Sequence, residues 1–343
     1  MILLSHFHIA KPMPNIGCTF DNIVCRMSKT VIVSKFCRSH IVLVQPTFFP
    51  KGFDFTDIKK IAIIGDTKRQ RATAEAFAKD GVEIAVCGDF DGFDANAAIT
   101  KCNDLSSAVG KAQAIILPFP VTRDGLYIEG SKISLDELFS VCDHIPLLGG
   151  GVDTHLRTAA ASYGVGITDY FEREELKIYN AVPSAEGAIF VAMKLMEKTL
   201  FSSEALILGF GRLSKALSSR LLALGCRVRV IARSKRDLAQ IAALGYSHGD
   251  FSQLAKFAAT ADVIFNTVPA KVMGEDIIEA TKPDCTIIDL ASNPGGVDRE
   301  CLALSERKFE WALGLPGKLF PKTAGEYIKT AVENIINERD EPS

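Results

Sequence analysis

Short apolar runs alternate with amphipathic stretches along most of the chain. The runs at 60–66 (KIAIIGD) and 82–86 (VEIAV) flank a stretch with helical spacing, and further runs follow at 113–118 and 145–150. Continuous apolar runs of this length are typical of parallel strands that are buried on both faces. The alternation predicts an α/β domain over residues 58–184, with a doubly wound parallel sheet of the flavodoxin-like or Rossmann-like type.

A second series of the same kind begins at 205–209 (ALILG) and continues to 309–313 (FEWAL). It predicts a second doubly wound domain, of the Rossmann type, over residues 202–317. We expect a bridging helix at 185–201, capped by Ser184, and a ligand cleft between the two domains. The remaining segment, 318–343, predicts a helix that packs back on the first domain.

Residues 1–57 follow neither a strand period nor a helix period, and we expect a poorly ordered extension without a function of its own. His6, His8 and Cys18 do not have the spacing of a recognised metal site, so no metal is predicted.

Composition excludes several classes of protein. Basic and acidic side chains number 39 and 41, a net charge of −2, which argues against a nucleic-acid or anionic-membrane partner. No apolar run approaches the ~18 residues that a membrane-spanning helix requires. The 9 cysteines are scattered without paired spacing, which is typical of reduced thiols in the cytoplasm.

The start of the second series carries a dinucleotide-binding pattern. Gly209 and Gly211 follow a strand, and Ser214 stands at the third small position of a GxGxxG-like turn that opens a helix. The first glycine permits the tight turn, the second lets the backbone approach a pyrophosphate, and the helix N-terminus attracts the phosphates. The expected contacts also include Arg212 and Leu213.

The end of the next strand bears on the choice of cofactor. An NAD site usually has Asp or Glu there to bind the ribose 2′-hydroxyl, but this chain has Arg233 followed by Ser234, Lys235 and Arg236. Two guanidinium groups, a hydroxyl and an ammonium group suit a 2′-phosphate, so NADP is favoured. A solvated, basic helix start is the plain alternative.

A polar segment follows a later strand of the same series. It consists of Asn266, Thr267, Val268 and Pro269, at the carboxyl edge where open α/β sheets bind ligands. Contact with the cofactor and a simple strand-ending turn are equally compatible with it.

Several segments together carry a family resemblance. They are FEREELKIYNAVPSAEGA (171–188), LGFGR (208–212), NTVPA (266–270), DLASNPGGVD (289–298) and GLPGKLFPKTAG (314–325). Over residues 58–338 the chain resembles the family formed by the A subunits of dipicolinate synthase. Ser214 departs from that family, which usually has glycine there.

The resemblance implies an NADP-dependent oxidation of dihydrodipicolinate to dipicolinate during sporulation, in the mother-cell cytoplasm. It also implies a flavoprotein-like B subunit as partner, and a homo-oligomer is compatible with it. Two alternatives stay open: another two-domain NADP oxidoreductase of a small carboxylate, like shikimate or alanine dehydrogenase, and an NADP-binding protein without chemistry of its own.

Such a reaction needs cations or backbone N–H groups for two substrate carboxylates, and a proton acceptor. The substrate-binding candidates are Arg69, Arg123, Lys318, Lys322 and the turn residues Asn293, Gly295 and Gly296. Glu186 is the candidate proton acceptor, with Asn180 and Ser184 beside it. In the first turn of a helix, Glu186 could equally stabilise the helix dipole.

Overall fold

The computed structural model describes residues 22–27, 30–37, 40–42, 57–90, 92–93, 97–142, 144–303, 305 and 307–338. The chain divides into two compact units. Unit 1 comprises Met1–Asp66, Val82–Asp169 and Ile336–Ser343, and unit 2 comprises Thr67–Gly81 and Tyr170–Ile335. No helix in the described ranges is long and apolar enough to cross a membrane.

A small antiparallel sheet precedes both α/β sheets. Its strands are β1 (Asn22–Met27), β2 (Thr30–Cys37) and β3 (His40–Val42), paired in chain order. The sequence pattern predicted no strands here. His6, His8 and Cys18 lie outside the described residues.

Unit 1 is built on a six-stranded parallel sheet with the order β6-β5-β4-β7-β8-β9. The strands are β4 (Lys60–Ile64), β5 (Glu83–Cys87), β6 (Ile99–Lys101), β7 (Ala114–Ile116), β8 (Leu147–Gly149) and β9 (Ile167–Asp169). Its helices are α2 (Leu105–Val109), α3 (Leu135–Val141) and α4 (Thr154–Ser162). Side-chain caps start all three helices, from Asp104, Ser134 and Asp153.

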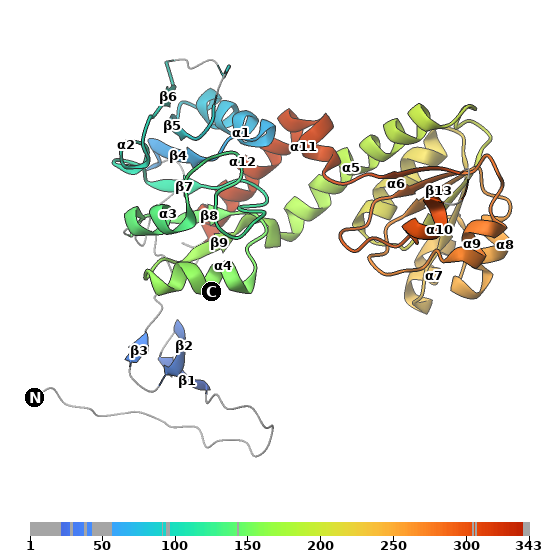
Figure 1. The fold of residues 1–343 in the computed structure, drawn as a ribbon, viewed down its shortest axis with the longest axis horizontal. Coiled ribbons are helices and arrows are strands. Elements are labelled where there is room, and N and C mark those ends of the chain that lie inside the picture. The colour runs from blue at the N-terminus through green and yellow to red at the C-terminus, as the bar shows by residue number, and fades with distance from the viewer. Residues whose placement is uncertain are drawn as a thin grey trace, which may run out of the picture. The chain divides into compact units, whose positions relative to one another are not determined.

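Unit 2 has a second six-stranded parallel sheet, with the order β12-β11-β10-β13-β14-β15. Its strand β13 is labelled in Figure 1. The strands are β10 (Glu204–Leu208), β11 (Arg227–Ile231), β12 (Ser247–Gly249), β13 (Val263–Asn266), β14 (Thr286–Asp289) and β15 (Lys308–Trp311). The helices that follow its strands are α6 (Arg212–Ala223), α7 (Lys235–Ala243), α8 (Leu254–Ala258), α9 (Glu275–Ala280) and α10 (Arg299–Ala303). Unit 2 also contains α1 (Lys68–Lys79), α5 (Glu174–Leu195), α11 (Leu315–Leu319) and most of α12 (Pro321–Glu338).

Both faces of the unit 2 sheet are buried. On β10, Ala205 and Ile207 contribute to a core that also includes residues of α5 and α6. The alternate residues, Leu206 and Leu208, belong to the opposite core, with residues of α8 and α9. This explains the continuous apolar runs and confirms the prediction of two doubly wound α/β sheets.

The helix expected to begin at Ser184 is longer than predicted. It is α5, which begins at Glu174 and contains Pro183 in its interior. The Ser184 hydroxyl donates to the Asn180 carbonyl oxygen at 2.7 Å, which is a helix-interior bond rather than an N-cap. The prediction that the helix starts at Ser184 is therefore wrong; Glu174 and Glu175 are its acidic first turn.

The C-terminal helix α12 packs on α1. The Lys329 ammonium pairs with Asp80 at 2.6 Å, and a Cβ atom added to Gly325 would lie 2.7 Å from the backbone nitrogen of Thr73. Helix α1, which follows β4 in the sequence, therefore lies against α12. The predicted domain limits themselves stay a prediction.

Candidate functional site

The turn after β10 requires glycine at its first position. Gly209 has a φ of +95°, and a Cβ atom there would lie 2.6 Å from the Thr267 hydroxyl oxygen. Its N–H donates to the Ile231 carbonyl oxygen at 2.8 Å, which fastens the turn to the neighbouring strand. A side chain at this position would be strained and would clash.

The second glycine leaves the start of α6 open. Gly211 is the N-cap residue of α6, with no side-chain hydrogen bond to the first turn, and a Cβ atom there would meet nothing within 4 Å. Uncapped N–H groups at the positive end of a helix dipole fit a phosphate group. The turn therefore fits the pyrophosphate of a dinucleotide.

Ser214 stabilises this turn through a hydrogen bond to Thr267. Its side chain is fully buried, and its hydroxyl lies 2.9 Å from that of Thr267. The Thr267 hydroxyl donates to the Leu208 carbonyl oxygen at 2.8 Å, so it accepts the Ser214 hydroxyl. Ser214 and Thr267 thus tie α6 to the ends of β10 and β13, whereas Leu213 packs against the apolar core.

Arg212, the first residue of α6, is held by an acid from α5. Its Nε and Nη2 donate to the two carboxylate oxygens of Glu174, at 2.7 and 2.5 Å. These hydrogen bonds lower the pKa of Glu174 and raise the pKa of Arg212. Glu174 was not among the predicted site residues, because no helix was expected to begin in the run EREELK and its partner Arg212 lies 38 residues away in the sequence.

The end of β11 presents four exposed polar side chains: Arg233, Ser234, Lys235 and Arg236. The Ser234 hydroxyl caps α7 by accepting the Asp237 N–H at 3.0 Å. The Arg233 guanidinium lies 5.4 Å from the centre of the Phe251 ring. Because β11 is the neighbour of β10, this basic group and the glycine turn share one edge of the sheet.

The side chain of Asn266, at the end of β13, makes its hydrogen bonds to other residues of the protein. Asn266 is fully buried and donates to Asp289 Oδ1 at 2.8 Å, while its Oδ1 accepts the Val268 N–H at 3.0 Å. Its amide therefore shapes the carboxyl edge, and any contact with a cofactor would come from its neighbours Val268 and Pro269.

In the turn 293–296, the backbone N–H groups of Gly295 and Gly296 also find their acceptors inside the protein. Gly296 N–H donates to Asp289 Oδ2 at 2.7 Å, and Gly295 N–H donates to the Ser292 carbonyl oxygen at 2.8 Å. Neither N–H is available to a substrate carboxylate in this arrangement, contrary to the expectation. Asn293 remains exposed.

Glu186, on α5, lies beside the last turn of α6 and not beside its start. It is half exposed and pairs with Arg220 at 3.3 Å. Arg220 comes eight residues after Arg212, so it lies ~12 Å further along the helix axis. The structure therefore does not bring Glu186 to the glycine turn. The Ser184 hydroxyl donates to the backbone carbonyl oxygen of Asn180 inside α5.

The four predicted substrate cations have different surroundings. Arg69 is buried, and this burial lowers its pKa; its guanidinium lies against Gly317 of α11. Lys318 and Lys322 are exposed on α11 and α12. Arg123, in unit 1, pairs with Glu129 at 2.8 Å.

Six cysteines of the two α/β units are free thiols: Cys87, Cys102, Cys142, Cys226, Cys285 and Cys301. Burial raises the pKa of Cys142 and of Cys285 to about 12. Both thiols stay protonated at neutral pH, so neither is a nucleophile.

The strand order, the glycine turn and the open helix N-terminus define unit 2 as a Rossmann-type, dinucleotide-binding domain. Residues 177–303 match the family described as the D-isomer specific 2-hydroxyacid dehydrogenase NAD binding domain. Residues 60–171 match the family of N-terminal domains from the A subunit of dipicolinate synthase.

Whole-chain comparisons agree. The chain is 30% identical over 287 residues to the A subunit of dipicolinate synthase from Bacillus subtilis strain 168, covering 81% of this chain and 96% of that relative. It therefore belongs to the dipicolinate synthase A-subunit family. The crystal structure of the A subunit from Bacillus halodurans superposes with a TM-score of 0.73 at 28% identity, over 83% of this chain and 98% of that one.

A more distant structure shares the fold. The transhydrogenase from Sinorhizobium meliloti superposes with a TM-score of 0.62 at 12% identity, over 81% of this chain and 94% of that one.

Proposed function

We propose that this chain oxidises dihydrodipicolinate to dipicolinate with NADP⁺ as the acceptor. The observation that carries the proposal is membership of the dipicolinate synthase A-subunit family, together with a glycine turn that fits a dinucleotide. In this reaction the dihydropyridine ring loses a hydride to the nicotinamide and a proton to a base, and becomes aromatic.

The choice of NADP over NAD rests on the end of β11. Arg233, Lys235 and Arg236 are exposed there, where an NAD site would have a carboxylate for the ribose 2′-hydroxyl. The Phe251 ring, whose centre lies 5.4 Å from the Arg233 guanidinium, leaves the charge of this group available to a ligand. A 2′-phosphate would accept charge-assisted hydrogen bonds from this group.

The chain's own contribution is to bind and orient. Gly209, Gly211 and the first turn of α6 would hold the pyrophosphate, and Val268 and Pro269 would border the nicotinamide half. We propose the exposed cations Lys318 and Lys322 as partners for the substrate carboxylates. Arg69 is buried against Gly317 and would act on α11 instead.

We further propose that the protein works with a second polypeptide, in the cytoplasm of a sporulating cell. The Bacillus subtilis relative is named as the A subunit of its enzyme, which supports a multi-subunit assembly. A flavoprotein-like B subunit is the expected partner.

The test is product formation by the purified chain, alone and with the B subunit. Dihydrodipicolinate is generated from aspartate semialdehyde and pyruvate, and dipicolinate is detected by terbium luminescence. We expect dipicolinate to appear only when both this chain and NADP⁺ are present. Tight NADP⁺ binding without any product, even with the B subunit, would instead support a cofactor-binding protein without chemistry.

A further inference from the structure

The ion pair between Glu174 and Arg212 lies at the start of α6, beside the proposed phosphate site. Arg212 is the first residue of α6, directly after Gly211, and both carboxylate oxygens of Glu174 accept its N–H groups. The two side chains are about half exposed, at 49% for Arg212 and 57% for Glu174. Solvent, and a ligand, can therefore reach the pair.

A cation at this position is unfavourable without an anion beside it. The N-terminus of a helix is the positive end of its dipole, and cations are preferred at the other end. The first turn of α6 also lacks a side-chain cap. Three positive features, namely the uncapped N–H groups, the dipole and the guanidinium, thus converge where Glu174 supplies the negative charge.

Glu174 is held in place by its helix. It is the first residue of α5, and a second ion pair, Glu186 with Arg220, joins the same two helices farther along. α5 therefore keeps the Glu174 carboxylate near the start of α6 whichever group Arg212 binds.

We infer that Glu174 competes with the dinucleotide diphosphate for Arg212 and so lowers the affinity of the site for its cofactor. The inference rests on the proposed function, since it requires a dinucleotide at this turn. An exposed ion pair contributes little to stability, so a diphosphate can replace the carboxylate as the partner of Arg212.

The experiment is a titration of the folded, full-length protein with NADP⁺ by isothermal calorimetry at low ionic strength. We expect Glu174→Gln to lower the Kd about two- to five-fold, which corresponds to the small value of an exposed pair. The difference should shrink at about 0.5 M salt, because added ions screen exposed charges. An unchanged or higher Kd in Glu174→Gln would overturn the inference.

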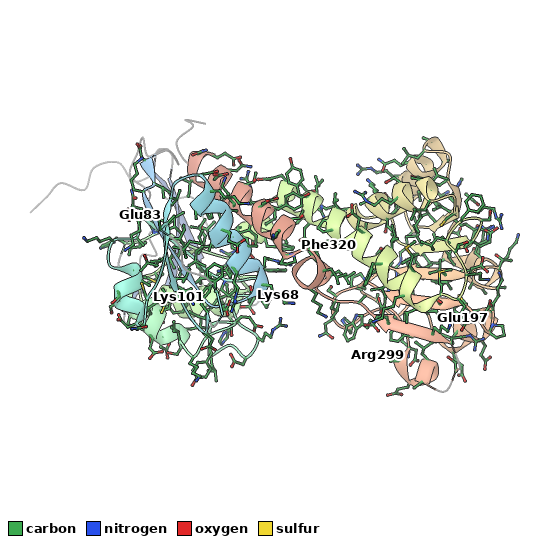
Figure 2. The ribbon with its side chains drawn as sticks, turned by 90° about the horizontal axis from the view of Figure 1, so that it is seen from above. Lys68, Glu83, Lys101, Glu197, Arg299 and Phe320 are labelled. Atoms are coloured by element: carbon green, nitrogen blue, oxygen red, sulfur yellow. The ribbon has the colours of Figure 1, made fainter. Side chains whose placement is uncertain are left out.

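Glu197→Gln is the matched control. Glu197 lies beyond the C-terminal end of α5 and is paired with Lys308 at 2.6 Å, so this change alters the net charge equally at the other end of the helix (Figure 2). We expect its Kd to equal that of the wild type. An equal gain in both variants would mean that net charge, rather than competition for Arg212, sets the affinity.

The role of Arg212 is isolated by a double variant. In an Arg212→Gln background, Glu174→Gln should no longer improve binding, because the contested partner is gone. A gain that persists would overturn the competition. A wild-type protein that binds neither NADP⁺ nor NAD⁺ would reject the proposed function itself, which is distinct from a wild type that binds while Glu174→Gln changes nothing.

Discussion

Gly209 and Gly211 differ in what their missing side chains allow. At Gly209 the protein itself fills the space, because Thr267 and Val268 lie where a Cβ atom and its neighbours would be. At Gly211 that space is open to solvent. One glycine thus serves the fold, and the other leaves room for a ligand.

This difference predicts two separate phenotypes. Gly209→Ala should lower the free energy of unfolding by about 1–3 kcal/mol, the cost of a strained backbone position, and abolish NADP⁺ binding. Gly211→Ala should unfold at the wild-type urea concentration but bind NADP⁺ weakly. Urea unfolding and calorimetric titration measure the two quantities. Equal stability of both variants would contradict the role given to Gly209.

Arg233 is the residue on which the proposed preference for NADP⁺ depends. We expect Arg233→Ala to weaken NADP⁺ binding about ten-fold, through loss of a charge-assisted hydrogen bond to the 2′-phosphate, and to leave NAD⁺ binding unchanged. Lys256→Ala, an exposed cation on α8, is the control. Equal loss for NADP⁺ and NAD⁺ would mean that Arg233 does not contact the 2′-phosphate.

At the scale of elements, Asp289 joins β13, β14 and the loop that follows. Its carboxylate accepts from the Asn266 amide and from the N–H groups of Ala291 and Gly296, at 2.7–3.0 Å. The carboxyl edge of the sheet is therefore fixed by a buried acid, which is 2% exposed.

Removing this acid should destabilise the edge. Asp289→Ala leaves three buried donors without their acceptor, so we expect the free energy of unfolding to fall by about 1–3 kcal/mol or more. Asp276→Ala, on the exposed start of α9, should have a much smaller effect. A wild-type urea midpoint for Asp289→Ala would contradict this role.

The elements that the sequence predicted are those with long apolar runs. The three-residue strands β6, β9 and β12 were not predicted because, unlike β7 and β8, they do not lie within a longer apolar run. The short helix α11 was not predicted, because Pro316 and Gly317 make LPGKL resemble a loop. The start of α5 was misplaced because Pro183 before a serine resembles a helix N-terminus.

The candidate site was predicted in part, for a similar reason. The glycine turn and the basic end of β11 follow from local spacing, and the structure joins them on adjacent strands. The engagement of Asn266 and Gly296 with Asp289, and of Glu174 with Arg212, depends on partners 7 to 38 residues away. Such pairings follow from the fold and not from local pattern.

Across unit 2 as a whole, a buried acid at the amino edge of the sheet joins segments that are far apart in the sequence. Asp262, directly before β13, accepts from Lys198 at 2.9 Å, from Lys282 at 2.6 Å and from the Glu204 N–H at 2.8 Å. Burial alone would raise the pKa of Asp262, but these hydrogen bonds outweigh it and hold the pKa at about 2.

A lowered pKa in the folded state makes stability depend on pH. The contribution of Asp262 is complete above the unfolded pKa of about 3.9 and is lost as the pH falls to its folded value. We therefore expect the melting temperature to fall more steeply between about pH 4 and pH 2 in the wild type than in Asp262→Asn. Parallel curves in a thermal-shift series would contradict this account.

The proposed reaction couples reduction of NADP⁺ to formation of dipicolinate in a fixed ratio. The most direct measurement follows NADPH absorbance and terbium-detected dipicolinate together, in one reaction with dihydrodipicolinate generated in place and the B subunit present. We expect the two products to rise in equal amounts, and much more slowly with NAD⁺. Dipicolinate that forms at the same rate without this chain, or without any NADPH, would contradict it.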